Sequence, residues 1–559
     1  MRLKSLAAGL VAVGVLMAQG AVATNSAVSG VVKDKVTGQP LANYTVSTWI
    51  NASYIGDNML QTQATRNVQA TTDSSGRYKL LDLPPGEHRI EAHDAQHFGP
   101  APTRHITTAG VDIEGIDFLV KLDGAIKGKV VDENKEPVPG MTISLVSREY
   151  FMGNVGYYVK GHGRTNDLGE YTVERVEAGH PYLILAEKRD RTLPAFSEAP
   201  LDPKLRKRVP MRTYYPDSPE KESAAAVVLR PGERREGVDI EVKKSPSYCI
   251  EGSLTGPNGP EGLSFSIEPL QPSSGISSGG GSFSVAPGGP AGEGGKFRIC
   301  DLYPGTYRFV AMERAASLST QAPNFAAVPI TITDQDQRNL KIPVSGGIPV
   351  EGEVVLDGAA PAAGLTAKVI VSLTPMLRTP YASELGGGRS DIPGTFSFPA
   401  KLPDDYRVSA LIMTPGLYVK DITYADRSVL YEPLRLGSAM AGSGRVRVTV
   451  GQDGATLAVR VADKDGKPGA DMHVLLIPAD VRSEGVLAAR MVQGQTDQTG
   501  QYTSTTLAPG KYYAMATEDS YDATVESIGK LWRSRNRYKE VDVAPSAAAQ
   551  VNLEPVKID

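Results

Sequence analysis

The sequence is poor in cysteine, histidine and aromatic side chains. Its 559 residues include 2 Cys and 7 His, and aromatic residues make up 6% of the chain. Two cysteines exclude a cysteine-rich zinc or iron–sulfur module and a small fold held together by many disulfides. Seven histidines are few for a large metalloenzyme, so we expect neither a metal nor a cofactor.

A basic excess is missing as well. The 59 Lys and Arg residues against 63 Asp and Glu residues give a formal net charge of -4. Because nucleic-acid binding relies on a surplus of Lys and Arg, nucleic acid is a poor partner for this chain.

Long apolar runs are confined to the start of the chain. After a basic start in residues 1–4, an apolar run covers residues 6–17 and small residues follow at 21–23. This pattern predicts a secretory signal peptide over residues 1–23. An uncleaved anchor is the alternative, although the run is shorter than the roughly 20 residues of a membrane span. We expect no transmembrane segment in the mature chain, and export to the periplasm, the cell surface or the exterior.

Glycine and proline mark a pattern that recurs five times along the rest of the chain. Each copy has a turn that contains Gly, an aromatic residue two positions later, and a second turn ten positions after the first. Both elements predict tight turns, since Gly takes positive φ at no steric cost. The marked positions are 76 and 86, 169 and 179, 295 and 305, 394 and 404, and 500 and 510, with Asp404 replacing the second Gly of the fourth copy.

Short strands are predicted around these turns. Residues 88–92, for example, alternate with a period of two, which is typical of a half-buried strand. Opening and closing strands recur in the copies, and about seven strands in roughly 107 residues predict an Ig-like β-sandwich. We therefore expect an all-β tandem array of five sandwiches, called repeats 1 to 5 below. Their predicted bounds are 24–121, 122–244, 245–344, 345–450 and 451–559.

One short helix is predicted in repeat 5, at about residues 525–538. Five basic residues lie in or next to it: Lys530, Arg533, Arg535, Arg537 and Lys539. Contact with an acidic partner or a membrane surface is one interpretation. We favour packing of its small apolar side, which contains Ile528 and Leu531, against its own sandwich.

The motifs resemble those of the carboxypeptidase regulatory-like family. They are the V-x-G-x-V opening strand, the D-x-x-G-x-Y turn and the L-x-P-G-x-Y turn, and repeats 1, 2 and 5 match best. The resemblance implies a transthyretin-like sandwich, grouped with carbohydrate-binding-like domains, in secreted or envelope proteins of bacteria. It implies binding or scaffolding without catalysis, and it transfers no catalytic residue.

Aromatic residues in the variable segments are candidate ligand-binding residues. Exposed rings offer apolar stacking faces with polar tips, which suits sugars. The alternative is that these rings pack in the sandwich cores. The candidates are Trp49, Tyr54, Tyr150, Tyr157 and Tyr158.

Histidines and aspartates give weaker signals. His88, His93, His97 and His105 lie close together in the sequence, and His93 and His97 are four residues apart. They fall on a predicted strand and loop, so we interpret the group as solvated loop residues rather than as zinc ligands. We expect Asp73, Asp167 and Asp497 to hydrogen-bond local backbone in turns. Residues 463–466 resemble the start of a calcium loop but lack its later glutamate, so a hairpin turn is the better interpretation.

The two cysteines are expected to form one disulfide. Cys249 and Cys300 lie on predicted strands of repeat 3, and an exported chain is exposed to oxidising conditions. The entropic model gives a stabilisation of roughly 4 kcal/mol for such a bridge.

Three functions follow as hypotheses. The first is an exported, non-catalytic binding or scaffold protein of the bacterial envelope, with a polysaccharide or envelope glycan as the ligand that the resemblance implies. The second is a structural or accessory subunit that binds a protein partner through open sheet edges. The third is a cryptic hydrolase that would use His93 or His97.

Overall fold

The computed structural model describes residues 25–558 with internal gaps. Outside the description lie residues 1–24, 51–52, 56–57, 61–65, 95–101, 152, 189–207, 258, 260–261, 270–287, 314–323, 347, 359–366, 376–387, 402–403, 438–443, 519–520 and 559. The predicted signal peptide falls outside the described residues and stays a prediction.

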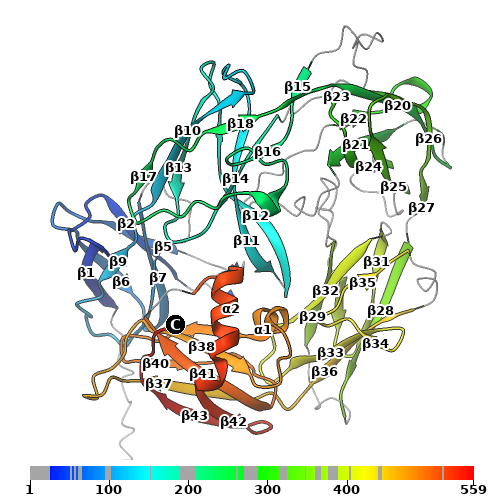
Figure 1. The fold of residues 1–559 in the computed structure, drawn as a ribbon. Helices are drawn as coiled ribbons and strands as arrows, with labels where there is room; N and C mark the ends of the chain where they lie inside the picture. The colour runs from blue at the N-terminus through cyan, green and yellow to red at the C-terminus, as the bar shows by residue number, and fades with distance from the viewer. Residues whose placement is uncertain are drawn as a thin grey trace, which may run out of the picture. The chain divides into compact units, whose positions relative to one another are not determined.

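The described residues form mainly β-strands arranged in paired sheets, which confirms the all-β prediction (Figure 1). Contacts divide the chain into two compact units, residues 1–33 with 39–119 and residues 34–38 with 120–559. Among the described strands, each predicted repeat supplies two main sheets, and repeats 1 and 2 each add a two-stranded sheet, β3-β4 and β15-β19. The bounds of five separate domains stay predictions.

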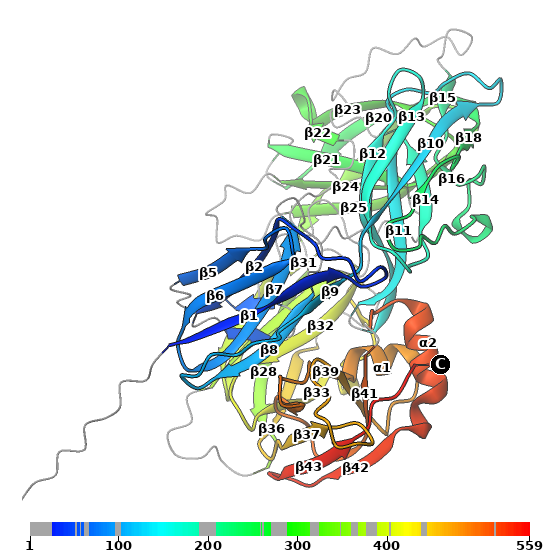
Figure 2. The ribbon, with the colours of Figure 1, turned by 90° about the vertical axis from the view of Figure 1, so that its left-hand side faces the viewer.

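Repeat 1 contains a three-stranded sheet with the order β6-β1-β9 and a four-stranded sheet with the order β5-β2-β7-β8. Figure 2 shows β6 and β1 side by side. Val28 in the first sheet and Ile90 in the second are fully buried. The strands are β1 (Ser26–Asp34), β2 (Tyr44–Ile50), β3 (Ser53–Ile55), β4 (Asn58–Leu60), β5 (Arg66–Thr71), β6 (Arg77–Leu83), β7 (Gly86–Asp94), β8 (Thr103–Thr108) and β9 (Phe118–Val120).

Repeat 2 pairs a sheet with the order β13-β10-β17, in which β18 also pairs with β10, with a sheet of order β12-β11-β14-β16. Ile126 and Ile143 from the two sheets meet in one buried cluster. The strands are β10 (Gly124–Asp132), β11 (Thr142–Phe151), β12 (Asn154–Arg164), β13 (Glu170–Val176), β14 (Leu183–Glu187), β15 (Arg208–Pro210), β16 (Thr213–Tyr214), β17 (Arg234–Arg235), β18 (Ile240–Val242) and β19 (Lys244–Pro246).

Repeat 3 has the sheet orders β23-β20-β26 and β22-β21-β24-β25-β27. Its core contains three phenylalanine rings, and those of Phe297 and Phe309 lie 4.8 Å apart. The strands are β20 (Tyr248–Thr255), β21 (Leu263–Pro269), β22 (Gly288–Pro290), β23 (Lys296–Leu302), β24 (Gly305–Glu313), β25 (Asn324–Ile332), β26 (Gln337–Pro343) and β27 (Ser345–Gly346).

Repeat 4 has the sheet orders β31-β28-β36-β33-β34 and β30-β29-β32-β35. Val350 and Val369 from the two sheets share its buried cluster. The strands are β28 (Ile348–Leu356), β29 (Lys368–Pro375), β30 (Gly388–Asp391), β31 (Gly394–Lys401), β32 (Asp405–Ile412), β33 (Tyr418–Tyr424), β34 (Arg427–Ser428), β35 (Leu434–Arg435) and β36 (Val446–Gly451).

Repeat 5 has the sheet orders β40-β37-β43 and β39-β38-β41-β42. Leu457 and Val474 from the two sheets meet in its core. The elements are β37 (Thr456–Val461), β38 (His473–Pro478), α1 (Glu484–Arg490), β39 (Val492–Gln495), β40 (Gln501–Thr503), β41 (Gly510–Thr517), α2 (Val525–Ser534), β42 (Lys539–Val543) and β43 (Ala548–Leu553).

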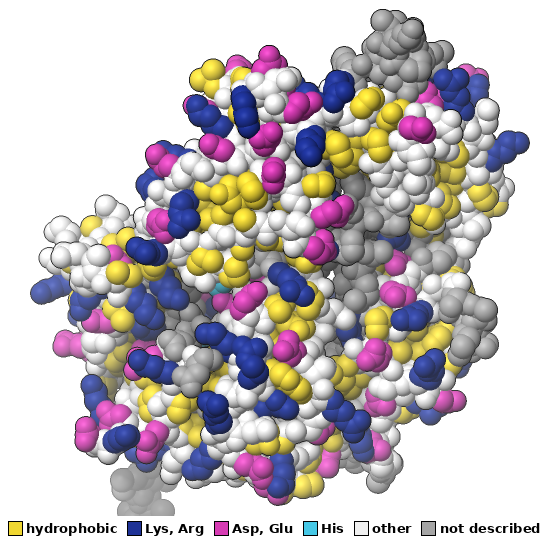
Figure 3. Space-filling view, in the orientation of Figure 1, with side chains coloured by type: hydrophobic (Ala, Val, Ile, Leu, Met, Phe, Trp, Pro, Cys, Tyr) yellow, Lys and Arg dark blue, Asp and Glu magenta, His cyan; other side chains and the backbone are white. Residues whose placement is uncertain are grey.

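The helix prediction for repeat 5 found one of the two α-helices that the structure describes there. The predicted helix is present as α2, and Ile528 and Leu531 are buried against Leu475 and Ile477 of the sheet, so it packs on its own sandwich. The prediction of one helix was wrong, since α1 is a second helix that starts after the N-cap Ser483. Figure 3 shows Lys and Arg side chains gathered over α2 on this face.

Asp side chains hold the predicted turns. Asp73, Asp497 and Asp463 each accept hydrogen bonds from the backbone N–H groups two and four positions later, at 2.8–3.0 Å. The carboxylate replaces backbone partners that a tight turn cannot supply. The hairpin interpretation of residues 463–466 is therefore confirmed.

In repeat 2 the turn residue is a different one from that predicted. Asn166, not Asp167, accepts the N–H groups of Leu168 at 3.0 Å and Glu170 at 2.9 Å. Asn166 stands three positions before Gly169, as Asp73 stands before its own glycine. The prediction was therefore displaced by one residue.

Replacement of Asn166 with alanine is expected to lower the free energy of unfolding by about 1 kcal/mol, because two hydrogen bonds that close the turn are lost. Asp167→Ala is the matched control, with an expected change within about 0.5 kcal/mol. Urea unfolding of the full chain measures both. Equal effects of the two substitutions would contradict the assignment.

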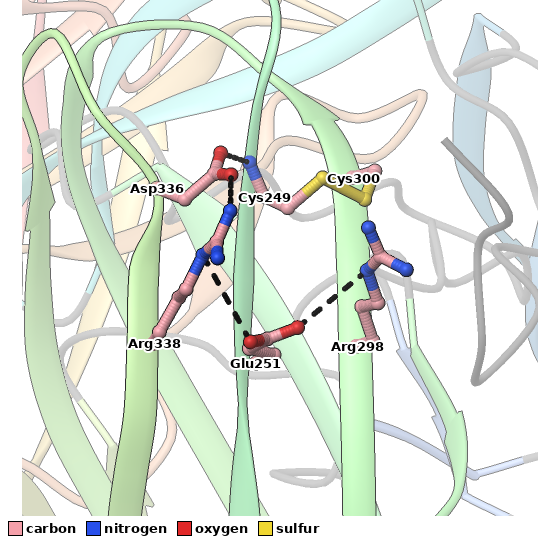
Figure 4. The surroundings of a disulfide bond; sticks show 6 residues. All are labelled: Cys249, Glu251, Arg298, Cys300, Asp336 and Arg338. Carbon is pink, nitrogen blue, oxygen red and sulfur yellow. Dashed lines mark hydrogen bonds and ion pairs between the residues drawn. A yellow bond between two sulfur atoms is a disulfide. The ribbon is translucent and has the colours of Figure 1, made fainter. Parts of the chain in front are cut away.

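The predicted disulfide between Cys249 and Cys300 is present, with an S–S distance of 2.03 Å (Figure 4). It links β20 to β23, which pair as neighbouring strands. Asp336 accepts the Cys249 N–H at 2.8 Å and contacts Arg338 at 3.3 Å. The bridge therefore closes the loop that contains β21 and β22.

Candidate interaction site

Three of the five candidate aromatic residues, all of them tyrosines, lie on one hairpin. Tyr150 is on β11, whereas Tyr157 and Tyr158 are on β12, and the two strands pair antiparallel over ten residue pairs. Tyr150 lies opposite Val155 in this register. Directly opposite residues share one face of a sheet, and successive residues alternate between faces. Tyr150 and Tyr157 therefore lie on one face of the hairpin, and Tyr158 lies on the other.

The ring of Tyr157 packs mainly against other residues of repeat 2. Its ring packs against the buried cluster of Val146 and Tyr214. The Nζ of Lys221 lies 4.3 Å from the ring centroid, which is a cation–π distance. Burial raises the pKa of the Tyr157 hydroxyl. This ring is a structural contact rather than an open stacking face.

Tyr158 forms a more accessible pair with Phe151. Their ring centroids are 6.3 Å apart with an interplanar angle of 58°. Phe151 is 42% exposed. This pair is the part of the hairpin where an aromatic face reaches solvent.

Tyr150 contacts repeat 5. Its hydroxyl donates to the Oε2 atom of Glu484 at 3.1 Å, and its backbone N–H donates to the carbonyl of Ala523 at 2.7 Å. The side chain also packs against the apolar cluster beneath the two helices. Burial, with help from Glu484, raises the pKa of Tyr150 to about 12. This candidate therefore joins two repeats.

The other two candidates lie in repeat 1. Trp49 is on β2 and is 41% exposed. Tyr54 is on β3, but its side chain falls outside the description. Both belong to the first compact unit of the chain, whereas the tyrosines of repeat 2 belong to the second.

His180 forms an ion-paired group with two carboxylates, one of them in repeat 5. Its Nε2 lies 3.0 Å from Glu177 and its Nδ1 lies 3.0 Å from Asp522, and the imidazole is 13% exposed. Burial alone would lower the pKa of His180, but the hydrogen bonds and charges of Asp522 and Glu177 raise it to about 10. Burial would likewise raise the pKa of Asp522, but His180 holds it below its ordinary value. The imidazole is thus positively charged at neutral pH.

Tyr150, His180, Glu484, Asp522 and Ala523 together are called the 2–5 joint below. Reasoning from the sequence missed His180, Glu177 and Asp522. The only local signal is the spacing of three between Glu177 and His180, which says nothing about a partner in repeat 5. The hydrogen bond from Tyr150 to Glu484 spans 334 positions of the sequence.

The histidines of repeat 1 do not assemble into a metal site in the part of the chain that is described. His88 is buried and contacts the carbonyl of Pro84 at 2.8 Å and the hydroxyl of Thr108 at 3.2 Å. The interpretation of this group as solvated loop residues is therefore wrong for His88. His93 lies at the end of β7, and His97 falls outside the description.

Comparison with known proteins identifies one segment. The family model of the carboxypeptidase regulatory-like domain matches residues 27–121. Residues 27–121 are a carboxypeptidase regulatory-like domain. This stretch coincides with repeat 1, where the sequence motifs predicted the family. No curated protein matches the chain.

Several solved structures resemble the chain at low scores. The minor pilin GBS52 of Streptococcus agalactiae is 16% identical over 40% of this chain and 97% of the pilin, with a TM-score of 0.24. The Bacillus anthracis TIE protein is 10% identical over 97% of this chain and 75% of that protein, with a TM-score of 0.14. The major pilin subunit BcpA of Bacillus cereus is 10% identical over 55% of this chain and 99% of the pilin, with a TM-score of 0.13. At these scores they carry no argument about partners.

The carboxypeptidase regulatory-like domain shares its strand framework with the later repeats. In repeat 1 the opening strand β1 lies between β6 and β9, just as β37 of repeat 5 lies between β40 and β43. The aromatic residue after the first turn fixes the closing segment, since the Tyr78 hydroxyl donates to the carbonyl of Ile116 at 2.7 Å. In repeat 2 the Tyr171 hydroxyl donates to the carbonyl of Val238 at 2.6 Å. No described helix is long and apolar enough to cross a membrane.

Replacement of His180 with glutamine is expected to weaken the 2–5 joint at neutral pH but not at pH 10. The pKa of this histidine is higher in the formed joint than its ordinary value of about 6.5. Protonation of His180 therefore stabilises the joint, and the stabilisation is complete below about pH 6.5. That contribution is lost as the pH rises toward 10, the value in the joint. Protection of the Tyr150 amide against hydrogen exchange should fall roughly 30-fold at pH 7, equal to about 2 kcal/mol.

The groups that surround His180 are Glu177, Asp522 and the ring of Tyr182, and Lys160 acts on Glu177. His162→Gln is the matched control, because His162 is exposed on β12 of the same repeat. A loss of protection that stays constant from pH 6 to pH 10 would contradict the role of the imidazole charge.

Proposed function

We propose that this chain is an exported, non-catalytic structural or accessory protein whose sandwiches act as a scaffold for a protein partner. The predicted signal peptide supports export, and so does the disulfide of repeat 3. The carboxypeptidase regulatory-like domain at residues 27–121 supports a binding or structural role.

Specific polar contacts between successive repeats support the scaffold. Arg308 of repeat 3 and Asp404 of repeat 4 form an ion pair at 2.7 Å, with side chains only 8% and 10% exposed. Between repeats 4 and 5, the Gly416 N–H donates to the Thr506 hydroxyl at 3.0 Å. Separation of the two charges of a nearly buried ion pair is costly, so this pair favours the arrangement in which the two repeats meet. Repeats 3, 4 and 5 are therefore joined by defined contacts.

The observation that carries the partner proposal is the edge of β12. This strand has 11 residues and, among the described strands, a sheet neighbour on one side only, β11. An edge strand presents backbone donors and acceptors that an extended partner can pair with. Tyr150 and Val155 are opposite each other, and the Tyr150 N–H points away from β12 to Ala523. In such a non-hydrogen-bonded pair the Val155 N–H points away from β11, toward the free edge.

Val155→Pro tests this edge, since proline removes the outward N–H without removing a β11–β12 hydrogen bond. Cross-linking in the native envelope first identifies a stoichiometric protein partner, and its affinity for the purified full chain is then measured. The proline variant is expected to bind at least about tenfold more weakly. Val155→Thr keeps the donor and should bind like the unaltered chain. Equal affinities of both variants would exclude the β12 edge.

Glycan binding is the second candidate function, and the exposed Phe151–Tyr158 pair favours it. Stacking of a sugar on these rings predicts saturable binding to one polysaccharide or envelope glycan that Tyr158→Ala abolishes. Tyr157→Ala removes a ring that already packs on Lys221 and serves as the comparison. A null result across the panel would leave the scaffold function alone.

A further inference from the structure

Strand β11 extends beyond its neighbour β14. The pairing with β14 covers residues 142–146 of β11, whereas the pairing with β12 continues to Phe151. Along this extension, Glu149 forms an antiparallel bridge with Thr524, and the Tyr150 N–H donates to the carbonyl of Ala523 at 2.7 Å. Residues 522–524 of repeat 5 thus meet the sheet edge of repeat 2 through one β-bridge and its flanking backbone hydrogen bond.

Side chains give this edge contact its selectivity. His180 lies between Glu177 of its own repeat and Asp522 of the added segment, at 3.0 Å from each. Charge-assisted hydrogen bonds of this kind are roughly twice as strong as neutral ones. An acidic residue at the position of Asp522 is therefore part of what the edge recognises.

Backbone packing adds a requirement of shape. A Cβ atom on Gly153 would lie 2.8 Å from the carbonyl oxygen of Gly485, and one on Gly485 would lie 2.3 Å from that of Gly153. The tip of the β11–β12 hairpin and the start of α1 therefore touch through bare backbone. Together with Tyr150, which packs into the cluster beneath the helices, these contacts form a fitted surface pair.

The two halves of this surface pair are distant in the sequence. Tyr150 and Glu484 are 334 positions apart, and repeats 3 and 4 lie between them. Interfaces between domains of one chain resemble transient protein–protein interfaces, so relative motion of the domains is expected unless the interface is large and hydrophobic. When this one opens, the edge of β11 and residues 522–524 are each left without the partner that fits.

We infer that the 2–5 joint exchanges between two copies of this chain, so that β11 of one copy takes residues 522–524 of the other. The inference rests on the proposed scaffold function, of which it names the partner as a second copy. Residues 522–524, which fit the edge of β11, are present in every copy of this chain. Exchange of identical elements between copies therefore needs no new contact. Within one chain the effective concentration is about millimolar, so exchange requires crowding, as in an array on a surface.

Engineered cysteines at positions 149 and 524 distinguish a joint that closes within one chain from a joint that is exchanged between two copies. Glu149 and Thr524 form a bridge flanked by the Tyr150 hydrogen bond, which makes them a non-hydrogen-bonded pair. Such pairs lie at the close end of the roughly 4.5–5.5 Å range of opposite Cβ atoms, which meets the upper limit of about 4.5 Å for a disulfide. Two full-length single variants, Glu149→Cys and Thr524→Cys, are mixed at rising concentration and oxidised mildly. The expected result is a disulfide-linked heterodimer on a non-reducing gel, increasing with concentration.

The double variant with both cysteines controls for folding, because it should close within one chain at low concentration. Arg435→Cys, whose side chain is 73% exposed in repeat 4, replaces Glu149→Cys in a control for random collision.

Closure of the double variant without any heterodimer up to about millimolar protein would overturn the exchange. So would a heterodimer yield no higher than that of the Arg435→Cys control. Neither result affects the β12 edge test, so a failure of exchange and a failure of the proposed function are distinguishable.

Discussion

Gly128→Ala is expected to destabilise repeat 2 by about 3–5 kcal/mol. A Cβ atom at this position would lie 1.9 Å from the carbonyl oxygen of Val238 and 3.0 Å from the hydroxyl of Tyr171. The Val238 oxygen also accepts the Tyr171 hydroxyl hydrogen bond at 2.6 Å. Because the obstructing atoms are backbone, the closing segment must move away and the buried hydrogen bond is lost. Urea unfolding of the full chain, followed by hydrogen exchange in β10, measures the loss.

Gly346→Ala is the matched control for this prediction. Its added Cβ would come no closer than 3.7 Å to a neighbouring atom, so the expected change is within about 0.5 kcal/mol. Gly30 repeats the geometry of Gly128 in repeat 1, at 1.9 Å from the carbonyl oxygen of Ile116. If Gly128→Ala and Gly346→Ala were equally stable, close approach of the closing segment would not be the reason for the glycine.

Removal of the disulfide is expected to cost repeat 3 about 4 kcal/mol. Cys249 and Cys300 are 51 positions apart, so the bridge restricts a long loop in the unfolded chain. The double variant Cys249→Ala with Cys300→Ala tests this, since both side chains are small and buried. Hydrogen exchange resolved along the chain should show increased opening in β20 and β23 and little change in repeat 5.

Reduction provides the control for the disulfide prediction. A reductant should destabilise the unaltered chain about as much as the double substitution does, and it should leave the double variant unchanged. An unaltered unfolding midpoint for repeat 3 after both treatments would contradict a stabilising role for the bridge.

Local patterns in the sequence predicted the fold class well. The turn signals predicted the strands that flank them because Gly and Asp residues such as Gly76 and Asp73 act within a few positions. The disulfide was predictable because Cys249 and Cys300 are the only cysteines of a chain that is predicted to be exported. Helix α1 was missed because its seven residues are too few to show a helical period.

The candidate site was predictable only in part. Tyr150, Tyr157 and Tyr158 were singled out as exposed rings, but each has a different environment. Alternation on the hairpin puts Tyr158 on one face and the other two on the opposite face. Lys221 contacts the ring of Tyr157, and residues of repeat 5 contact the ring of Tyr150. A sequence pattern that spans a few residues cannot predict such distant neighbours.

The sequence by itself determined that this is an array of β-sandwiches with turns at set positions, because strand periodicity and turn chemistry are local. Only the tertiary structure decided what the repeats do to one another. It brought His180 to Asp522 and Tyr150 to Ala523, and among the described strands it gave β12 a neighbour on one side only. Such contacts depend on the packing of segments separated by hundreds of residues, and no local spacing encodes them.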